Sequence, residues 1–217
     1  MVGAATGALA AGPRPVVGVL ALQGSFAEHV EALAALGVGT RLVRRPADLE
    51  GLRAIILPGG ESTAMGRLLS DFALLEPLRA AVAGGLPAWG TCAGAILLAR
   101  SISNDSRRHL ALMDLEVERN AYGAQLESFR AAAPIAGLEG GDFPLVFIRA
   151  PAFVGLGPGV EPLASSGGKV VACRQGTMVA TAFHPELSGD RRFHRWFLEQ
   201  VAGLSLPAAG SGDGQAA

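Results

Sequence analysis

The chain has 217 residues, of which 50% are hydrophobic and 17% charged, and its formal net charge is −1. This length fits one domain with a substantial core. The nearly neutral balance gives no electrostatic reason to expect nucleic acid or an anionic membrane as a partner. No stretch has the unbroken apolarity of a membrane span, and the two cysteines form no disulfide framework, so we expect a reduced, cytoplasmic setting.

One domain flanked by two tails is the expected organisation. Residues 1–14 are small and apolar, without the basic and leucine-rich regions of a secretory signal, and residues 204–217 are rich in Ala, Gly and Ser. We expect both tails to be disordered around a domain that spans residues 15–203.

The first half of the chain alternates apolar runs with helical periodicity. Continuous apolar runs are typical of strands buried on both faces of a parallel sheet. In chain order we expect a strand at 16–22, a helix at 26–36, strands at 40–43 and 54–57, helices at 64–69 and 74–82, and a strand and helix within 87–98. This rhythm predicts an α/β fold with a doubly wound, mostly parallel open sheet of the flavodoxin type and right-handed crossovers.

The second half of the chain has shorter elements. Alternating apolar and polar residues over 111–118 indicate a half-exposed strand. We expect further strands at 143–148 and 160–164, an antiparallel hairpin of 169–174 and 178–183, and a final helix at 190–201.

The segment from Gly90 to Gly94 carries the strongest chemical signal. Its Gly-x-Cys-x-Gly pattern between a strand and a helix is the form of a nucleophile elbow with Cys92 in place of serine. Such a turn is sharp, and side chains at the two glycine positions would collide with neighbouring backbone. Free N–H groups at the helix start would favour a thiolate. A buried structural cysteine beside turn glycines is the alternative.

A cysteine nucleophile needs a base and a group that orients it. His184 and Glu186 stand two residues apart at the end of a predicted strand, so both can point to one side, toward Cys92. This predicts a Cys-His-Glu triad.

The remaining histidines are expected at the surface. His29 and His194 fall inside predicted helices, and His109 falls in a polar loop.

The loop after the strand at 54–57 is a candidate for the ligand crevice, which lies beyond the carboxyl ends of strands in open α/β sheets. Its glycines would let the Gly60 N–H approach a reacting carbonyl, and the Ala93 N–H can aim at the same oxygen from the helix start. These two donors would form an oxyanion hole. A Gly-Gly turn capped by Ser62 or Thr63 is the alternative.

The elbow at 90–94 together with 184–186 resembles the class I glutamine amidotransferase family. Further segments resemble a subgroup of that family, the glutaminase subunits of pyridoxal 5′-phosphate synthases: 19–24, 57–63, 112–114, 117–120, 127–129, 147–151 and 183–187. The elbow is generic to the class, whereas 59–63 and 117–120 together are specific to the subgroup.

The resemblance implies a class I glutaminase fold and hydrolysis of L-glutamine to glutamate and ammonia. The ammonia would pass to a synthase subunit that makes pyridoxal 5′-phosphate, and no metal or other cofactor is expected. The family's glutamine-binding positions fall on Gly60, Glu61, Ser62, Arg119, Ile148 and Arg149.

An arginine suits the α-carboxylate of glutamine, and a carboxylate suits its α-ammonium. As alternatives, the arginines could form surface ion pairs and Glu61 could be a helix-start residue.

One segment departs from the family pattern. Tyr122 and Ala124 stand where the family usually has phenylalanine and arginine, which puts the details of coupling to the synthase in doubt. Two rival functions stay open: a glutaminase subunit that feeds another synthase, and a non-enzymatic cysteine redox sensor on the same fold.

Overall fold

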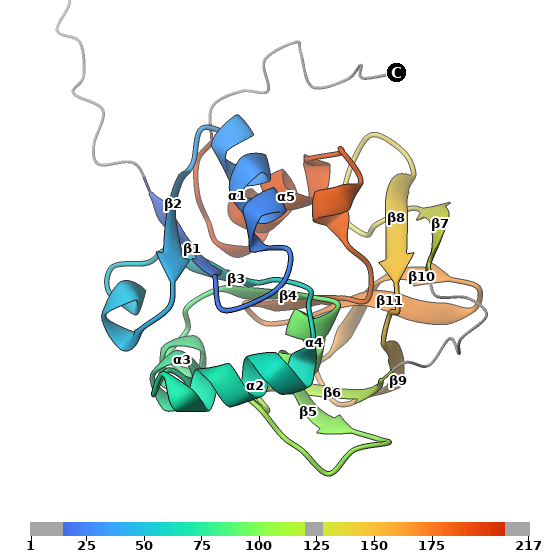
Figure 1. The fold of residues 1–217 in the computed structure, drawn as a ribbon. Coiled ribbons are helices and arrows are strands. Elements are labelled where there is room, and N and C mark those ends of the chain that lie inside the picture. The colour runs from blue at the N-terminus through green and yellow to red at the C-terminus, as the bar shows by residue number, and fades with distance from the viewer. Residues whose placement is uncertain (1–14, 120–127, 207–217) are drawn as a thin grey trace, which may run out of the picture.

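The computed structural model describes residues 15–119 and 128–206, which form an α/β fold around a seven-stranded sheet (Figure 1). In spatial order the strands are β10 (Glu161–Ser166), β11 (Lys169–Gln175), β12 (Met178–Thr181), β4 (Ala88–Thr91), β3 (Ala54–Leu57), β1 (Val16–Leu20) and β2 (Gly39–Val43). All pairs from β12 to β2 are parallel, and β10, β11 and β12 pair in antiparallel fashion. The predicted fold class and hairpin are confirmed.

Helices cover both faces of this sheet, as Figure 1 shows. One face carries α1 (Phe26–Ala35) and α5 (Arg192–Trp196), which continues as a π-helical turn over Phe197–Val201. The other face carries α2 (Ser62–Asp71), α3 (Leu75–Ala83) and α4 (Ala93–Leu98). Two short 3-10 helices follow strands, η1 (Pro46–Leu49) and η2 (Pro185–Leu187). None of the helices in the described part of the chain is long and apolar enough to cross a membrane.

Two small sheets flank the central one. One contains β5 (Ala99–Ile102), β6 (Met113–Glu118) and β9 (Ala152–Leu156), and the other pairs β7 (Ser128–Ala133) with β8 (Phe143–Ile148). The expected strand at 143–148 is β8, and its partner β7 was not predicted. These small sheets matter for the site because β6 and β8 end beside the carboxyl edge of the central sheet.

An aromatic cluster packs the α5 face of the sheet. Trp89 on β4 stacks on Phe193 at 4.9 Å between ring centroids and contacts Phe197 at 5.5 Å. Phe183 and Phe143 extend the same cluster, and all of these rings are fully buried. Burial of such large rings is the main favourable term in folding this layer. Leu204, one residue past the predicted end of the domain, is also buried.

The prediction that His29, His109 and His194 lie at the surface was wrong. Their exposed fractions are 0%, 7% and 1%. Within α1, Leu33 is buried and Phe26 and Val30 are half-buried against the core, and His29 and Ala32 are buried beside them. A histidine can be buried on this face because polar partners inside the protein satisfy the ring nitrogens of His29.

Candidate active site

Cys92 occupies a strained turn between β4 and α4. Its φ of 49° and ψ of −103° lie in a region that side chains rarely adopt. A Cβ at Gly90 would collide with the backbone of Gly94, and one at Gly94 would collide with the Leu57 carbonyl. The Cys92 N–H donates to the Thr181 carbonyl at 2.8 Å, which ties the turn to β12. The local geometry is therefore that of a nucleophile elbow.

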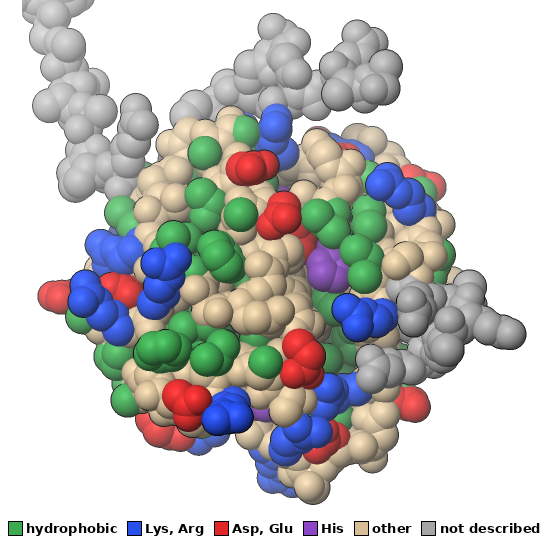
Figure 2. All heavy atoms as spheres, viewed as in Figure 1, with side chains coloured by type: hydrophobic (Ala, Val, Ile, Leu, Met, Phe, Trp, Pro, Cys, Tyr) green, Lys and Arg blue, Asp and Glu red, His purple; other side chains and the backbone are tan. Residues whose placement is uncertain are grey.

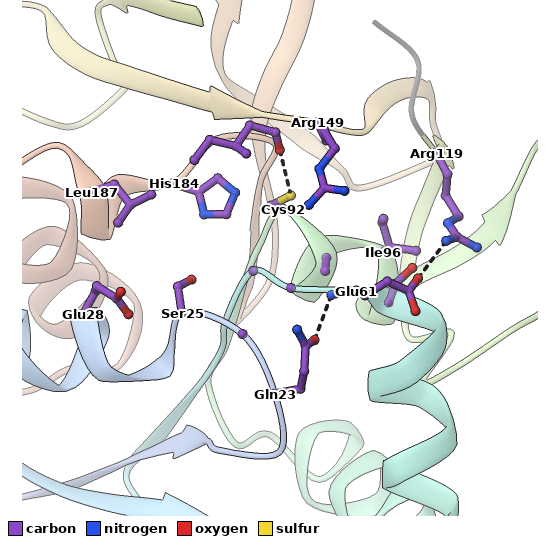
Figure 3. A pocket seen from close by; sticks show the side chains of 16 residues that line it. Gln23, Ser25, Glu28, Glu61, Cys92, Ile96, Arg119, Arg149, His184 and Leu187 are labelled. Atoms are coloured by element: carbon purple, nitrogen blue, oxygen red, sulfur yellow. Dashed lines mark hydrogen bonds and ion pairs between the residues drawn. The ribbon is translucent and has the colours of Figure 1, made fainter. Parts of the chain in front are cut away.

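His184 and Glu186 lie next to this turn, at the start of η2. The His184 N–H donates to the Val146 carbonyl at 2.8 Å, which fixes the backbone against β8. The His184 Nδ1 lies 2.8 Å from Glu186 Oε1, and the ring lies beside Cys92 (Figure 3). Their side chains are 8% and 0% exposed. The fold thus brings the three predicted residues together.

The protonation of this buried group follows from its contacts. Burial alone would lower the pKa of His184, but its contacts with Cys92 and Glu186 raise it to about 10. Burial would raise the pKa of Glu186, but His29, His184 and Ser25 lower it to about 2. The arrangement therefore favours a protonated imidazole beside an ionised carboxylate.

A pocket of about 390 Å³ opens in front of Cys92 (Figure 3). Every predicted glutamine-binding residue lines it: Gly60, Glu61, Ser62, Arg119, Ile148 and Arg149. Cys92, Ala93 and His184 line the same pocket, whereas Glu186 lies behind the histidine. The volume is large enough for a small amino acid such as glutamine.

The far end of the pocket holds charged side chains. Arg119 donates to Glu61 Oε1 and to Asp105 Oδ2, each at 2.9 Å. Glu61 also caps α2, because it accepts from the Thr63 and Ala64 N–H groups at 2.9 and 2.7 Å. Glu61 therefore both caps the start of α2 and lines the pocket.

The electrostatics of Glu61 reflect these contacts. Burial would raise the pKa of Glu61, but the Thr63 and Ala64 N–H groups and Arg119 hold it below its usual range. Glu61 is therefore ionised at neutral pH and available to a cation.

The end of β8 supplies the side wall of the pocket. The Cys92 sulfur lies 3.8 Å from the Ile148 carbonyl oxygen, so Ile148 contacts the sulfur through its backbone. Arg149 follows with φ of 42°, in the left-handed region, and its side chain faces the pocket in Figure 3. Backbone strain of this kind gathers at functional sites.

The predicted oxyanion donors, the N–H groups of Gly60 and Ala93, belong to residues that line the pocket with Cys92. Neither the Gly60 nor the Ala93 N–H has an intramolecular acceptor within residues 15–119 and 128–206. The Gly59 carbonyl accepts from the Ser25 N–H at 3.0 Å, which sets the orientation of the Gly59–Gly60 peptide. The Gly60 N–H points the opposite way from that carbonyl.

Sequence reasoning missed three contributors from the β1–α1 segment. Gln23 Oε1 accepts from the Glu61 N–H at 2.8 Å, Ser25 Oγ donates to Glu186 Oε1 at 2.7 Å, and His29 lies behind Glu186. The resemblance at 19–24 pointed at this segment without assigning it a role. The departures at Tyr122 and Ala124 lie outside the described residues.

Known proteins match both the sequence and the fold. Residues 19–203 match the SNO glutamine amidotransferase family. The chain is 55% identical over 184 residues to pyridoxal 5′-phosphate synthase subunit PdxT of Pelotomaculum thermopropionicum, covering 85% of this chain and 94% of that protein. It is 54% identical over 187 residues to the subunit of the same name from Roseiflexus sp., covering 84% and 98%.

A crystal structure of a glutamine amidotransferase superposes with a TM-score of 0.82 at 49% identity, covering 87% of this chain and 99% of that one. A putative GMP synthase component from Thermoplasma acidophilum, with a TM-score of 0.65 and 18% identity, shares the fold, covering 88% and 95%. The family match spans most of the chain. The matches to relatives that are about half identical to this chain cover nearly the whole length of those relatives. The chain therefore belongs to the SNO glutamine amidotransferase family.

Proposed function

We propose that this protein is the glutaminase subunit of a pyridoxal 5′-phosphate synthase. It hydrolyses L-glutamine to glutamate and ammonia, and the ammonia passes to a synthase subunit. The observation that carries this proposal is Cys92 in its elbow, in contact with a buried His184–Glu186 pair, on the floor of a pocket with charged groups at its far end. The choice of pyridoxal 5′-phosphate synthase as the partner rests on the names of the relatives.

The first chemical step is attack of the Cys92 sulfur on the carboxamide carbon of glutamine. His184 holds the thiol proton and delivers it to the leaving ammonia, which leaves a thioester on Cys92. Glu186 fixes the imidazole tautomer through Nδ1, at 2.8 Å, so that Nε2 is free for the proton transfer. The Ala93 N–H at the start of α4 stabilises the developing oxyanion, with the Gly60 N–H as its second donor.

The second step is hydrolysis of the thioester. His184, neutral after it has given its proton to ammonia, takes a proton from water, and the resulting hydroxide attacks the thioester carbon. The C–S bond breaks, glutamate leaves, and the proton on His184 restores the starting pair with the Cys92 thiolate. The protein's own residues supply every group that this acyl transfer requires.

The charged end of the pocket would hold the amino-acid part of the substrate. Arg119 and Arg149 can bind the α-carboxylate, and Glu61 can bind the α-ammonium. In the structure Arg119 pairs with Glu61 itself, so substrate binding would insert between two groups that already attract each other. This arrangement preserves charge balance in the empty pocket.

The Gly59–Gly60 peptide suggests that docking of the synthase controls the rate. A peptide flip would change φ of Gly60 toward positive values, which glycine accepts, and would re-aim the Gly60 N–H. The flip would break the 3.0 Å bond from the Ser25 N–H to the Gly59 carbonyl, which favours the present orientation in the isolated chain. One missing oxyanion donor costs about 3 kcal/mol of barrier, or on the order of a hundredfold in rate.

The test is a glutaminase assay on the purified chain, alone and with saturating synthase subunit. Glutamate release that rises on adding the synthase, together with transfer of ammonia to it, would support the proposal. Equal rates with and without the synthase would show that the oxyanion hole is preformed. Absence of hydrolysis under both conditions would remove the glutaminase function.

The two rival functions make different predictions. A glutaminase for another synthase would hydrolyse glutamine but transfer no ammonia to the pyridoxal phosphate synthase. A redox sensor would be oxidised by peroxide at Cys92 and would not turn over glutamine. The buried His184–Glu186 pair favours the enzyme, because a sensor needs no oriented base. The cytoplasmic location stays a prediction.

A further inference from the structure

A buried group of polar side chains lies behind Glu186, and the mechanism above does not use it. His29 on α1 and His194 on α5 are 0% and 1% exposed. The His29 Nδ1 lies 3.0 Å from His194 Nε2. Its Nε2 lies 3.3 Å from Thr91 Oγ1 and 3.3 Å from Glu186 Oε2. A second histidine therefore contacts the same carboxylate as His184, from the opposite side of the triad.

The start of α1 contacts both oxygens of this carboxylate. Ser25 and His29 stand four residues apart, so they lie on one face of the helix start. The Ser25 hydroxyl donates to Oε1 at 2.7 Å, the oxygen that also faces His184. No donor in the described part of the chain makes a hydrogen bond of strict geometry to Oε2, and the His29 Nε2 is the polar group that faces it.

The contacts of His29 decide its tautomer. If Nδ1 carried the proton, the Nε2 lone pair would face the carboxylate oxygen of Glu186 at 3.3 Å, which is repulsive. A proton on Nε2 instead points toward the Thr91 hydroxyl and attracts Oε2 at 3.3 Å, outside strict hydrogen-bond geometry, and Nδ1 accepts from the His194 Nε2–H. The second tautomer is therefore favoured.

The charge of His29 depends on burial and on the titratable groups around it, which come from α1, η2 and α5. Burial lowers its pKa, Glu186 raises it, His184 lowers it and Glu28 raises it, with a net decrease. His194, the other titratable neighbour, has its pKa lowered to about 3 by burial. Both rings are therefore neutral at physiological pH, and His29 acts on the carboxylate as a neutral donor.

A contact to Oε2 restricts rotation of the Glu186 carboxylate, which the contacts to Oε1 leave free. The terminal torsion of a glutamate side chain is soft, so bonds to one oxygen alone do not fix the plane of the carboxylate. The plane of Glu186 in turn sets the direction of its bond to His184 Nδ1. Without a donor at Oε2 the carboxylate can rotate and carry the imidazole with it.

We propose that His29 is a positioning residue, which holds Glu186 Oε2 and so orients His184 toward Cys92. This inference rests on the proposed glutaminase function. His29 does not line the substrate pocket, so its loss should change the rate of the chemical steps and not the binding of glutamine. Small displacements of catalytic groups have large rate effects.

The experiment compares His29→Leu, His29→Gln and His29→Asn in glutamate release with saturating synthase subunit. His29→Leu removes the donor and should lower kcat about tenfold or more with unchanged KM. His29→Gln places an amide N–H near the position of Nε2 and should recover most of kcat. His29→Asn is shorter and can reach the His194 side but not Oε2, so it should stay low.

Leu33→Ala is the matched control. Leu33 lies one turn further along the same buried face of α1 and is 0% exposed, and its truncation removes packing without a hydrogen bond. This variant should lose stability and keep kcat at a temperature where it stays folded.

The outcomes distinguish a failure of the proposed glutaminase function from a failure of the positioning role of His29. A wild-type protein without glutaminase activity would overturn the proposed function itself. With an active wild type, a normal kcat for His29→Leu would overturn the positioning role. Should that variant fail to fold, equal kcat for His29→Gln and His29→Asn would overturn it in the same way. A change confined to KM, or an equal loss of kcat in Leu33→Ala, would also overturn it.

Discussion

The two ends of the candidate active-site pocket are built in opposite ways. At one end, His184 and Glu186 are 8% and 0% exposed and are fixed by hydrogen bonds to neighbouring segments. At the other end, Glu61 is 53% and Arg119 20% exposed; ion pairs hold the Arg119 guanidinium, and the Thr63 and Ala64 N–H groups also hold the Glu61 carboxylate (Figure 2 shows basic and acidic side chains on this face of the molecule). Buried contacts act at low dielectric, whereas exposed ion pairs are weak and salt-sensitive.

This contrast assigns different tasks to the two ends. The buried end needs one fixed geometry, because proton transfer and attack depend on position. In the proposed function, the exposed end exchanges its internal ion pair for contacts with the substrate, which requires side chains that can move. Changes at the buried end should therefore affect kcat, and changes at the exposed end should affect KM.

The largest effect is expected at Cys92. Cys92→Ala should abolish glutamine hydrolysis, a loss on the order of 10⁴ or more, because no other cysteine among the described residues lines the pocket. A glutamine-like electrophile should label Cys92 and leave Cys173 unmodified, since burial raises the pKa of Cys173 to about 12. Peptide mapping checks both, and label on Cys173 would contradict the assignment.

The next largest effects are expected from removing His184, the proposed base, and then from removing the charge of Glu186, which would orient it. His184→Asn should lower kcat about a thousandfold, and Glu186→Gln about a hundredfold, because the amide keeps the shape but loses the charge. Steady-state glutamate release with a constant synthase concentration measures both. A Glu186→Gln variant with wild-type kcat would leave Glu186 only a structural role.

Lowering the pH should reveal how much the Glu186 carboxylate contributes to the free energy of unfolding. The folded pKa of Glu186 is about 2, below its ordinary value of 4.5, so its ionised form contributes stability above pH 4.5 that is lost as pH falls toward 2. The difference in unfolding free energy between wild type and Glu186→Gln should shrink by about 3 kcal/mol over this range. Denaturant unfolding at several pH values tests this, and a constant difference would refute it.

The smallest effect is expected at the exposed end. Arg119→Gln should raise KM for glutamine about tenfold with little change in kcat, because one charge-assisted contact to the α-carboxylate is lost. Arg107→Gln is the control, since Arg107 pairs with Asp105 and Thr63 but does not line the pocket. If both variants raised KM equally, Arg119 would act through the Asp105 network and not on substrate.

The central sheet could be predicted from the sequence for local reasons, and the candidate residues at the buried end, Cys92, His184 and Glu186, do lie together in the fold. Strands such as β3 are continuous apolar runs, and the elbow encodes its strain in glycines that stand beside Cys92. The contact of His29 with Glu186 could not be read in this way. Apolar periodicity counts a histidine as polar, and only the packing of α1 against η2 shows what surrounds it. The bonds of Arg119 to Glu61 and Asp105 likewise depend on loop conformation.

The pairing of β12 with β4 has a kinetic consequence for folding. Cys92 follows β4 and His184 follows β12, and these strands are neighbours although much of the chain lies between them. Closing so long a loop is entropically costly, and contacts of high sequence separation form slowly. A refolding chain can therefore gain helices and the β1–β3 pair while it still lacks enzymatic activity. Return of activity during refolding reports the moment when the last parallel strand joins the sheet.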